Sequence, residues 1–371
     1  MTKEIPDHIN SNLPTENEPQ QESEALYVHR VIQVDKGQDY IRVDKFLLNR
    51  LENVSRNKIQ IGIDAGNVLV NKKVVKCNYR IKPGDIISIV LAEEPVNHFL
   101  VAENIPLNIV YEDTEIALVN KPAGMVVHPG VGNYTGTLVN GLLYHFLQQS
   151  DSKQLAVEII EKRSPESFTQ EVRPYLVHRI DKNTSGILVV AKNQTALEFL
   201  GKQFFYHSIQ RKYVALIWGE PKADEGTITG NIGRNPNDRQ KFYVTDNPEE
   251  GKHAVTHYKV IERMGYVSLI ECQLETGRTH QIRVHMSNIG HPIFSDETYG
   301  GNKIMKGTIY AKYKQFVENC FAMCPRQALH AQSLGFIHPT TQKEIYHEVP
   351  MPDDMKNVIE KWRNFVKAMN D

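Results

Sequence analysis

The strongest chemical candidate in the 371-residue sequence is a carboxylate in a short polar segment. Residues His178–Gly186 read His-Arg-Ile-Asp-Lys-Asn-Thr-Ser-Gly and lead directly into the apolar run Ile187–Ala191. A buried strand that follows a polar loop can hold a loop side chain rigidly at the mouth of a cleft. Asp181 is therefore a candidate nucleophile or base, with Thr184–Gly186 supplying a tight turn. The alternative is an ordinary capped turn whose charges serve solubility.

A second segment, Glu275–His285, could supply cations to such a carboxylate. Thr279 is suited to cap a helix over residues 280–288, and the amides at the start of a helix favour anions. Either Arg278 or Arg283 could hold a buried aspartate ionised, because a nearby cation opposes the effect of desolvation. The alternative is that both arginines contact phosphates only.

A tyrosine beside two cations is the third candidate. Residues Arg211–Leu216 read Arg-Lys-Tyr-Val-Ala-Leu, which places Tyr213 at the start of an apolar run typical of a strand. Tyr213 could act as a stacking platform for a displaced base. The alternative is a half-buried aromatic residue at the edge of a sheet.

The charges are distributed unevenly behind a formal net charge of −1. Residues 1–39 contain eight acidic and three basic side chains, whereas residues 40–90 contain ten Lys and Arg against four Asp and Glu. Residues 1–24 contain hardly an apolar side chain, so we expect residues 1–38 to be a mostly disordered acidic tail. The basic block indicates a separate module over residues 40–95.

Within this module the apolar spacing predicts two helices and a small hairpin sheet. Val43, Phe46, Leu47 and Leu51 share one helical face, and Ser55 is a plausible cap for a second helix that stops at Gly66. Strand-like segments at Val68–Val70 and Ile86–Val90 surround the turn Lys82–Asp85, and a linker is expected at Glu93–Phe99.

Residues 100–371 alternate short strands with a few helices, which predicts an α+β domain with a mixed, mainly antiparallel sheet. No glycine-rich phosphate loop appears, so a doubly wound nucleotide fold is disfavoured. Met305–Met323 lacks a clear period and is interpreted as a peripheral insertion. The expected strands are Ile116–Asn120, Ile187–Ala191, Tyr213–Trp218, His257–Glu262 and Val267–Leu274, and the expected helices cover residues 195–205 and 280–288.

The sequence is typical of a reduced, cytoplasmic protein. Its four cysteines are too few and too scattered for a disulfide scaffold. Met1–Tyr27 lacks a basic start followed by an apolar run, and no stretch approaches about 18 consecutive apolar residues. We therefore expect neither secretion nor a membrane span, and we expect a monomer.

Taken together, these segments resemble the RluA/RluD family of pseudouridine synthases. The family's signature around its catalytic aspartate matches His178–Gly186, with Ile180 where Leu is more usual. Further matches are Asn120–Gly130, Arg211–Ala215, Thr276–His285 and Arg326–Ala331, so the resemblance covers most of the chain. The basic module is similar to the S4 RNA-binding domain, and His128–Asn133 followed by Gly136 and Thr137 is most similar to the RluD type, which acts on large-subunit ribosomal RNA.

The resemblance implies a role for each candidate residue. Asp181 would be the essential carboxylate, Arg283 would pair with it, Tyr213 would stack on the target uracil, and Arg179 would fill the space left by a flipped uridine. The remaining residues expected to bind the substrate are His178, Thr184, Arg278, His280 and Gln281.

The implied reaction detaches uracil from C1′ and rejoins it through C5, so no cofactor is required. An ionised Asp181 could attack C1′, add to C6 or remove the 2′ proton, and the sequence leaves these routes open. His280 and His285 lack a carboxylate that would complete a metal site, so we expect structural histidines and no metal.

Two other classes of function remain open at this point. A non-catalytic RNA-binding or ribosome-assembly protein could keep the fold without turnover, although Asp181, Tyr213 and Arg283 are all present. A carboxylate-dependent nucleoside hydrolase would release uracil instead. The expected partner is RNA, either large-subunit ribosomal RNA or an assembling ribosomal particle, with transfer RNA as the alternative substrate.

Overall fold

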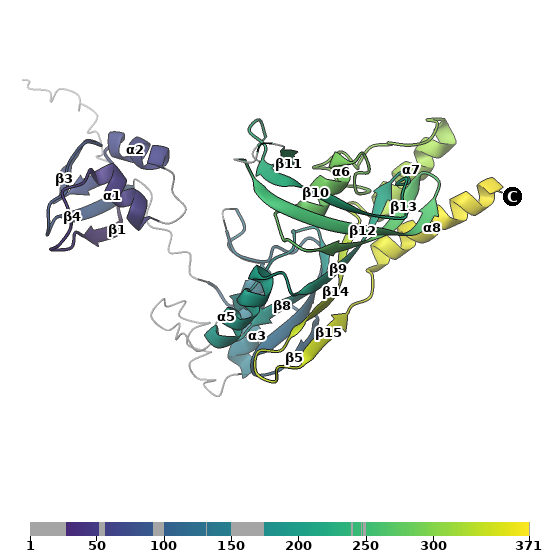
Figure 1. Cartoon of the computed structure of the whole chain (residues 1–371), viewed down its shortest axis with the longest axis horizontal. Helices are drawn as coiled ribbons and strands as arrows, with labels where there is room; N and C mark the ends of the chain where they lie inside the picture. Colours follow the sequence, from purple (N-terminus) through teal and green to yellow (C-terminus); the bar gives the residue numbers. More distant parts are fainter. Residues whose placement is uncertain are drawn as a thin grey trace, which may run out of the picture. The chain divides into compact units, whose positions relative to one another are not determined.

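The computed structural model describes residues 27–51, 56–91, 100–130, 132–149, 174–238, 240–245, 247 and 250–370. The predicted cap Ser55, the predicted linker and the segment 1–24 lie outside these ranges. The chain divides into two compact units, Met1–His98 and Phe99–Asp371 (Figure 1). None of the helices in the described ranges is long and apolar enough to cross a membrane.

The first unit packs two helices on a four-stranded antiparallel sheet in the order β1-β4-β2-β3. Phe46, Leu47 and Ile63 are buried in its core, as their helical spacing predicts. Strand β1 lies inside the segment expected to be the tail, so the ordered sheet begins before residue 38. The elements are β1 (Tyr27–Gln33), α1 (Val43–Arg50), α2 (Arg56–Asp64), β2 (Val68–Val70), β3 (Lys73–Val74) and β4 (Ile86–Leu91).

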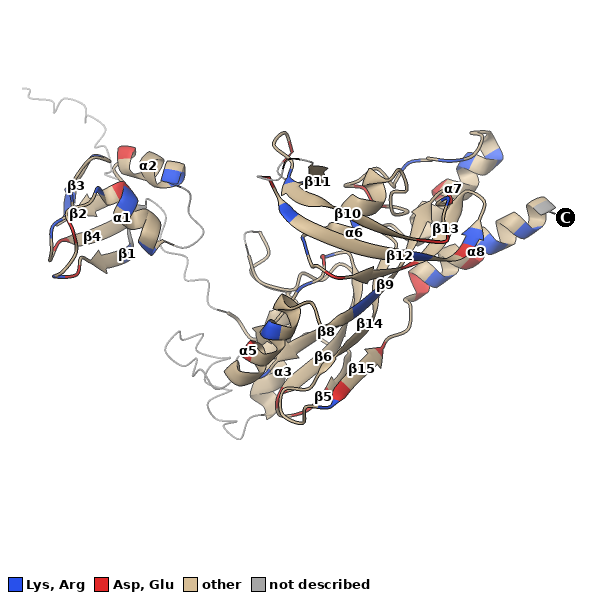
Figure 2. Ribbon diagram, viewed as in Figure 1, with Lys and Arg blue, Asp and Glu red and all other residues tan. Residues whose placement is uncertain are grey.

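A buried carboxylate arranges two of the cations of this unit. Asp44 is fully buried and accepts hydrogen bonds from Arg42, Arg56 and Gln60. Burial opposes its ionisation, but these bonds outweigh that effect and lower the pKa of Asp44 to about 2. The side chains of Arg42 and Arg56 stay 40% and 45% exposed, so their charges face solvent. Figure 2 shows basic residues on both helices.

The second unit is built on an 11-stranded sheet in the order β11-β10-β12-β13-β9-β14-β8-β6-β5, with β15 paired to β14 and β7 to β8. Only the β14–β8 pair among the described strands is parallel, which confirms the predicted α+β class with a mixed, mainly antiparallel sheet. The strands are β5 (Ile109–Glu112), β6 (Ile116–Lys121), β7 (Tyr175–Leu176), β8 (Ser185–Ala191), β9 (Gln210–Trp218), β10 (Glu225–Arg234), β11 (Phe242–Thr245), β12 (Lys252–Met264), β13 (Val267–Leu274), β14 (Leu329–Ile337) and β15 (Glu344–Glu348).

Strand β8 is buried on both faces. Ile187 and Val189 pack with Leu200 of α5 (Gln194–Phe205), whereas Leu188 and Val190 pack with residues such as Leu142 of α3 (Leu138–Gln149). Alternate residues of a strand point to opposite faces, so a strand between two helical layers has a continuous apolar sequence. The apolar run after the polar segment therefore becomes the strand that anchors it.

The far half of the sheet carries three more helices: α6 (Gln281–Asn288), α7 (Ala311–Met323) and α8 (Asp353–Asn370). Interpreting Met305–Met323 as a peripheral insertion is wrong for its second half. Tyr313 and Val317 of α7 are buried and pack in the main core with Trp362 of α8 and Trp218 of β9. The sequence pattern is weak there because aromatic contacts with another helix, rather than a regular apolar stripe, hold α7.

Strands β8 and β14 meet in a short parallel pair, and a glycine allows their backbones to come this close. The predicted tight turn at Thr184–Gly186 is wrong, because β8 already begins at Ser185. Gly186 has φ +121°, and a Cβ atom there would lie 2.1 Å from the carbonyl oxygen of Ala331. Only glycine fits this approach of two backbones next to the Asp181 segment.

Gly186→Ala should therefore lower the free energy of unfolding by more than about 3 kcal/mol or prevent soluble expression, because both the backbone and Ala331 would have to move. Gly124→Ala is the matched control, since Gly124 has φ +85° with no atom within 4 Å of the added methyl group. We expect the control to cost about 1–2 kcal/mol. Equal losses in chemical denaturation of the two variants would contradict the steric explanation.

Candidate active site

Asp181 lies in the loop between β7 and β8, and this loop is held at both ends. The amide of Thr184 donates to the carbonyl oxygen of Asp181 at 3.1 Å and closes a turn over Lys182 and Asn183. Ile180 is buried in the main core on the other side. The carboxylate of Asp181 remains 19% exposed, so a fixed backbone presents it to an open space.

Lys121, the last residue of β6, ties this loop to a second one. Its Nζ donates to the carbonyl oxygens of Pro122 (2.7 Å), Met125 (2.9 Å) and Lys182 (3.0 Å). The side chain is fully buried, and burial lowers the pKa of Lys121 to about 7. Three carbonyl acceptors match the three donors of an ammonium group and favour its protonated form. The sequence motif contains Lys121, but spacing alone does not indicate this anchoring role.

Arg283 of α6 bridges Asp181 and a second carboxylate. Nη1 of Arg283 donates to Oδ2 of Asp181 at 3.0 Å, while Nε and Nη2 donate to the two oxygens of Asp296 at 2.7 and 2.9 Å. Burial alone would lower the pKa of Arg283, but the hydrogen bonds and charge of Asp296, together with those of Asp181, raise it above its ordinary value. The guanidinium is therefore a permanent cation in a fixed orientation.

Asp296 is the main site residue that the sequence did not indicate. It is fully buried, and its Oδ1 also accepts from the amides of Thr298 and Tyr299 at 3.0 and 3.2 Å. It follows a short apolar segment in a region without a recognisable period, so nothing in the local pattern separates it from a turn aspartate. Only the fold brings it to Arg283.

The start of α6 differs from the prediction, because Thr279 does not cap the helix. The residue before the helix is His280, which has φ 56° and makes no side-chain capping bond. Oε1 of Gln281 instead accepts from the amide of Arg278 (2.9 Å) and the hydroxyl of Thr276 (2.8 Å). This closed turn brings the chain into the helix through a left-handed residue.

Gln281, which is predicted to bind the substrate, uses its whole side-chain amide for bonds within the protein. Besides the two bonds that its oxygen accepts, its Nε2 donates to the carbonyl oxygen of Val255 (2.9 Å) and the hydroxyl of Thr256 (3.0 Å). An amide side chain has two donors and two acceptor positions, so no polar atom remains for a ligand. The geometry fits a residue that fixes the loop before α6.

The opposite wall of the site is aromatic. Tyr213 of β9 is 8% exposed, makes no hydrogen bond to other described residues through its hydroxyl, and has a pKa raised by burial. Beside it, Arg211 lies over the ring of Phe204 at 5.4 Å and donates to the carbonyl oxygen of Glu275 at 2.9 Å. Arg211 has no carboxylate partner in the described ranges, and its buried Nε has no hydrogen-bond partner there.

His178 supports this wall in its neutral form. Its Nε2 accepts a hydrogen bond from the amide of Val189 at 3.1 Å, and its ring stacks on Phe204 with centroids 4.6 Å apart. Burial and the nearby charge of Arg211 lower the pKa of His178 to about 3. Because Nε2 accepts, the neutral ring carries its proton on Nδ1, so Nδ1 is the donor that remains for the substrate contact predicted for His178.

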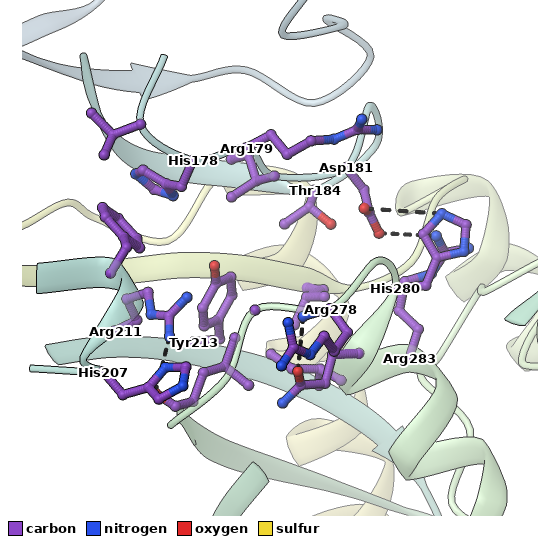
Figure 3. Close-up of a pocket in the computed structure, with 18 of the residues that line it drawn as sticks. His178, Arg179, Asp181, Thr184, His207, Arg211, Tyr213, Arg278, His280 and Arg283 are labelled. Carbon is purple, nitrogen blue, oxygen red and sulfur yellow. Dashed lines mark hydrogen bonds and ion pairs between the residues drawn. The ribbon is translucent and has the colours of Figure 1, made fainter. Parts of the chain in front are cut away.

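These walls enclose a cavity of about 560 Å³ (Figure 3). Asp181 faces Arg283 and His280 on one side, and the phenol of Tyr213 projects toward the loop that carries Asp181. Arg179 is exposed and extends along the outside of that loop, away from Tyr213. Every residue that the sequence assigned to the site lines the cavity: Asp181, Tyr213, Arg283, Arg179, His178, Thr184, Arg278, His280 and Gln281.

Thr184 and His285 are both buried and make hydrogen bonds within the protein. Thr184 is buried, and its hydroxyl accepts from Nε2 of Gln327 at 3.3 Å. His285 is buried as well, with its Nδ1 2.9 Å from the hydroxyl of Thr256. In the part of the chain that the structure describes, no three His, Cys, Asp or Glu side chains are grouped so as to hold a metal ion.

Comparison with known proteins assigns this arrangement to a class. Residues 115–288 match the RNA pseudouridylate synthase family model, and residues 41–87 match the S4 domain model. An uncharacterized RNA pseudouridine synthase of Chlorobaculum parvum is 44% identical over 91% of this chain and 98% of its own length. The chain belongs to the RNA pseudouridine synthase family, which isomerises uridine in RNA to pseudouridine, and the resemblance to the RluA/RluD branch is confirmed.

Two further relatives agree with this assignment. The ribosomal large subunit pseudouridine synthase D of Zymomonas mobilis is 40% identical over 85% of this chain and 92% of that protein. The solved structure of human RNA pseudouridylate synthase domain containing 4 matches with a TM-score of 0.53 and 22% identity, over 69% of this chain and 93% of that one. The second likeness supports the fold alone.

Three histidines with lowered pKa values predict that the fold loses stability in mild acid. Burial lowers the pKa of His178 to about 3 and those of His285 and His330 to about 4, against about 6.5 in an unfolded chain. Between pH 6.5 and 4 the unfolded state therefore binds more protons, so stability falls as the pH falls. Each histidine should contribute up to about 1.4 kcal/mol per pH unit.

Denaturant titrations at several pH values would measure this slope for the wild type and for His330→Gln. The variant should show a slope smaller by about one histidine's share, whatever its absolute stability. An unchanged slope would mean that His330 is already protonated in the folded protein.

Proposed function

We propose that Asp181 is the catalytic carboxylate of this synthase and that Arg283 pairs with it and orients it. The observation that carries the proposal is the single guanidinium shared by Asp181 and the fully buried Asp296. A guanidinium in a fixed orientation can hold a carboxylate oxygen in one position. Attack on C1′, addition to C6 and removal of the 2′ proton all need the free carboxylate, so the arrangement serves each route.

Tyr213 and Arg179 are proposed to handle the displaced nucleotide. The reacting atoms of a uridine in a duplex are inaccessible, so the base must leave the stack at a cost of a few kcal/mol. Stacking on Tyr213 would return about 1–3 kcal/mol of this cost. A cavity of about 560 Å³ is within the range of small-molecule sites. Arg179, exposed on the loop that carries Asp181, would enter the space that the base leaves.

We propose large-subunit ribosomal RNA, free or in an assembling particle, as the substrate. The name of the Zymomonas mobilis relative and the RluD-type motif at residues 128–137 support this choice over transfer RNA. The first unit would provide phosphate contacts that do not depend on sequence, through residues such as Lys72, Lys73 and Lys76, which are all exposed. We also propose a monomer in the cytoplasm, where thiols such as Cys77 and Cys272, unpaired here, stay reduced.

Asp181→Asn is the central test. The amide is nearly isosteric but neither nucleophilic nor basic, so turnover should fall at least about a thousandfold while RNA binding is retained. Purified protein would be incubated with a large-subunit ribosomal RNA transcript labelled with tritium at C5 of uridine, and tritium release would be counted. Carbodiimide labelling with primer extension would locate the product.

Asp353→Asn is the matched control, because that carboxylate is 89% exposed on α8. It should behave as the wild type. Near-normal tritium release by Asp181→Asn would refute the assignment of the carboxylate. Activity on transfer RNA but neither on the ribosomal transcript nor on precursor particles would refute the substrate alone.

The role of the first unit gives a separate prediction. Deleting residues 1–95 should weaken RNA binding and flatten the dependence of log affinity on log salt, without abolishing the chemistry. The slope should decrease by about 0.7–0.9 for each phosphate that the truncated protein no longer neutralises. A milder variant, Lys72→Gln with Lys73→Gln, alters only the β2–β3 turn and the first residue of β3, and it should remove one or two phosphate contacts. Filter-binding titrations at several salt concentrations measure both effects. An unchanged slope in the deletion variant would exclude a role of this unit in phosphate contact.

A further inference from the structure

Tyr299 occupies a position that links three parts of the site. Its ring lies under the guanidinium of Arg283, with 5.0 Å between the guanidinium carbon and the ring centroid. Its hydroxyl oxygen is 2.9 Å from Nδ1 of His280 and accepts a hydrogen bond from the amide of Phe242 at 3.1 Å. Its own amide donates to Asp296. One turn of the chain therefore supplies both the buried carboxylate and this tyrosine.

The hydrogen bonds of the Tyr299 hydroxyl determine which nitrogen of His280 carries a proton. The amide of Phe242 can only donate, so the oxygen of Tyr299 is an acceptor in that bond. The phenolic hydrogen then needs an acceptor, and Nδ1 of His280 is the one within hydrogen-bond distance among the described residues. If Nδ1 carried a proton instead, the hydroxyl hydrogen of Tyr299 would have no partner among the described residues in a half-buried position, which costs about 1–3 kcal/mol.

The remaining nitrogen of His280 faces the carboxylate. Nε2 lies 4.0 Å from Oδ1 of Asp181, while Arg283 holds Oδ2. In Figure 3 the His280 ring and the Asp181 carboxylate face each other across the end of the cavity. With Nδ1 accepting from Tyr299, Nε2 must carry the hydrogen of the neutral ring and direct it at Asp181.

We propose that Tyr299 is a positioning residue that fixes the proton of His280 on Nε2, so that His280 serves as a neutral second donor to Asp181. The carboxylate would then be oriented through both oxygens, by Arg283 on one and His280 on the other. A neutral donor orients the carboxylate without adding a second positive charge, which would stabilise its ionised form further and reduce its nucleophilicity. The 4.0 Å separation would shorten to a hydrogen bond when substrate excludes water.

The surroundings of His280 are consistent with a neutral ring. The charged groups that act on it are Asp181, Asp296, Arg283 and Arg179, two of each sign, and the ring of Phe242 packs edge-on with centroids 5.5 Å apart. Burial has the largest effect and lowers the pKa of His280 below its ordinary value. His280 therefore stays uncharged at neutral pH.

Two conservative variants test this inference. Tyr299→Phe removes the hydroxyl and keeps the ring under Arg283. His280→Asn removes the Nε2 donor and suits the left-handed backbone, because Asn tolerates φ near +56°. Each variant should lower the single-turnover rate at saturating RNA about 10- to 100-fold. Tyr299→Phe should leave RNA affinity unchanged, because Tyr299 does not line the cavity. If Tyr299 acts through His280, the double variant should be no slower than His280→Asn alone.

Nitrogen-15 NMR of histidine-labelled protein supplies a readout that a merely structural role would not change. The His280 signals, assigned from their loss in His280→Asn, should show a protonated Nε2 in the wild type and a mixture of tautomers in Tyr299→Phe. Wild-type turnover in Tyr299→Phe, independent multiplying losses in the double variant, or a wild-type proton on Nδ1 would each overturn the inference.

The inference rests on the proposed role of Asp181, so Asp181→Asn is measured in the same series on the C5-tritiated transcript. An active Asp181→Asn would show that the proposed function itself fails. An inactive Asp181→Asn together with a fully active Tyr299→Phe would leave that function standing and overturn this inference alone.

Discussion

The site depends on one guanidinium that two carboxylates share. Arg283 could not remain buried with a single partly exposed partner, because an uncompensated cation in a protein interior is costly. Asp296 neutralises it from the buried side and fixes its plane through two hydrogen bonds. The third donor is thereby directed at Asp181. Moving Asp296 would shift the cation that Asp181 contacts, although Asp296 does not line the cavity.

The other side of that ion pair is equally constrained, by the backbone. The loop of Asp181 is followed by a strand with no exposed face, and Lys121 joins it to the segment after β6 through three carbonyl oxygens. Gly186 allows the backbone of β8 to contact the backbone of Ala331 in β14. Asp181 and Arg283 thus meet because two rigid elements, β8 and α6, are each fixed independently.

The sequence was sufficient for the parts of this arrangement that are local. A polar segment before a uniformly apolar run predicted the loop and the strand that carry Asp181, and the bounds of β13 were predicted to the residue. Contacts made only by the fold were not predictable. Asp296 and Tyr299 lie in a region without period, α7 is held by aromatic residues from other elements, and the entry to α6 is set by Gln281 rather than by Thr279. In each case the contacting residue is distant in sequence, or a second local pattern predicts a different arrangement.

Strand β8, which is buried on both faces, also determines whether the protein or the uracil can move during the reaction. Local opening of a segment requires few buried contacts and exposed backbone bonds, and this strand offers neither. Displacing Asp181 by more than its side-chain rotamers would require separating β8 from two helical layers and from β6. The detached uracil must therefore rotate to bring C5 to C1′, while the part of the protein that holds Asp181 stays in place.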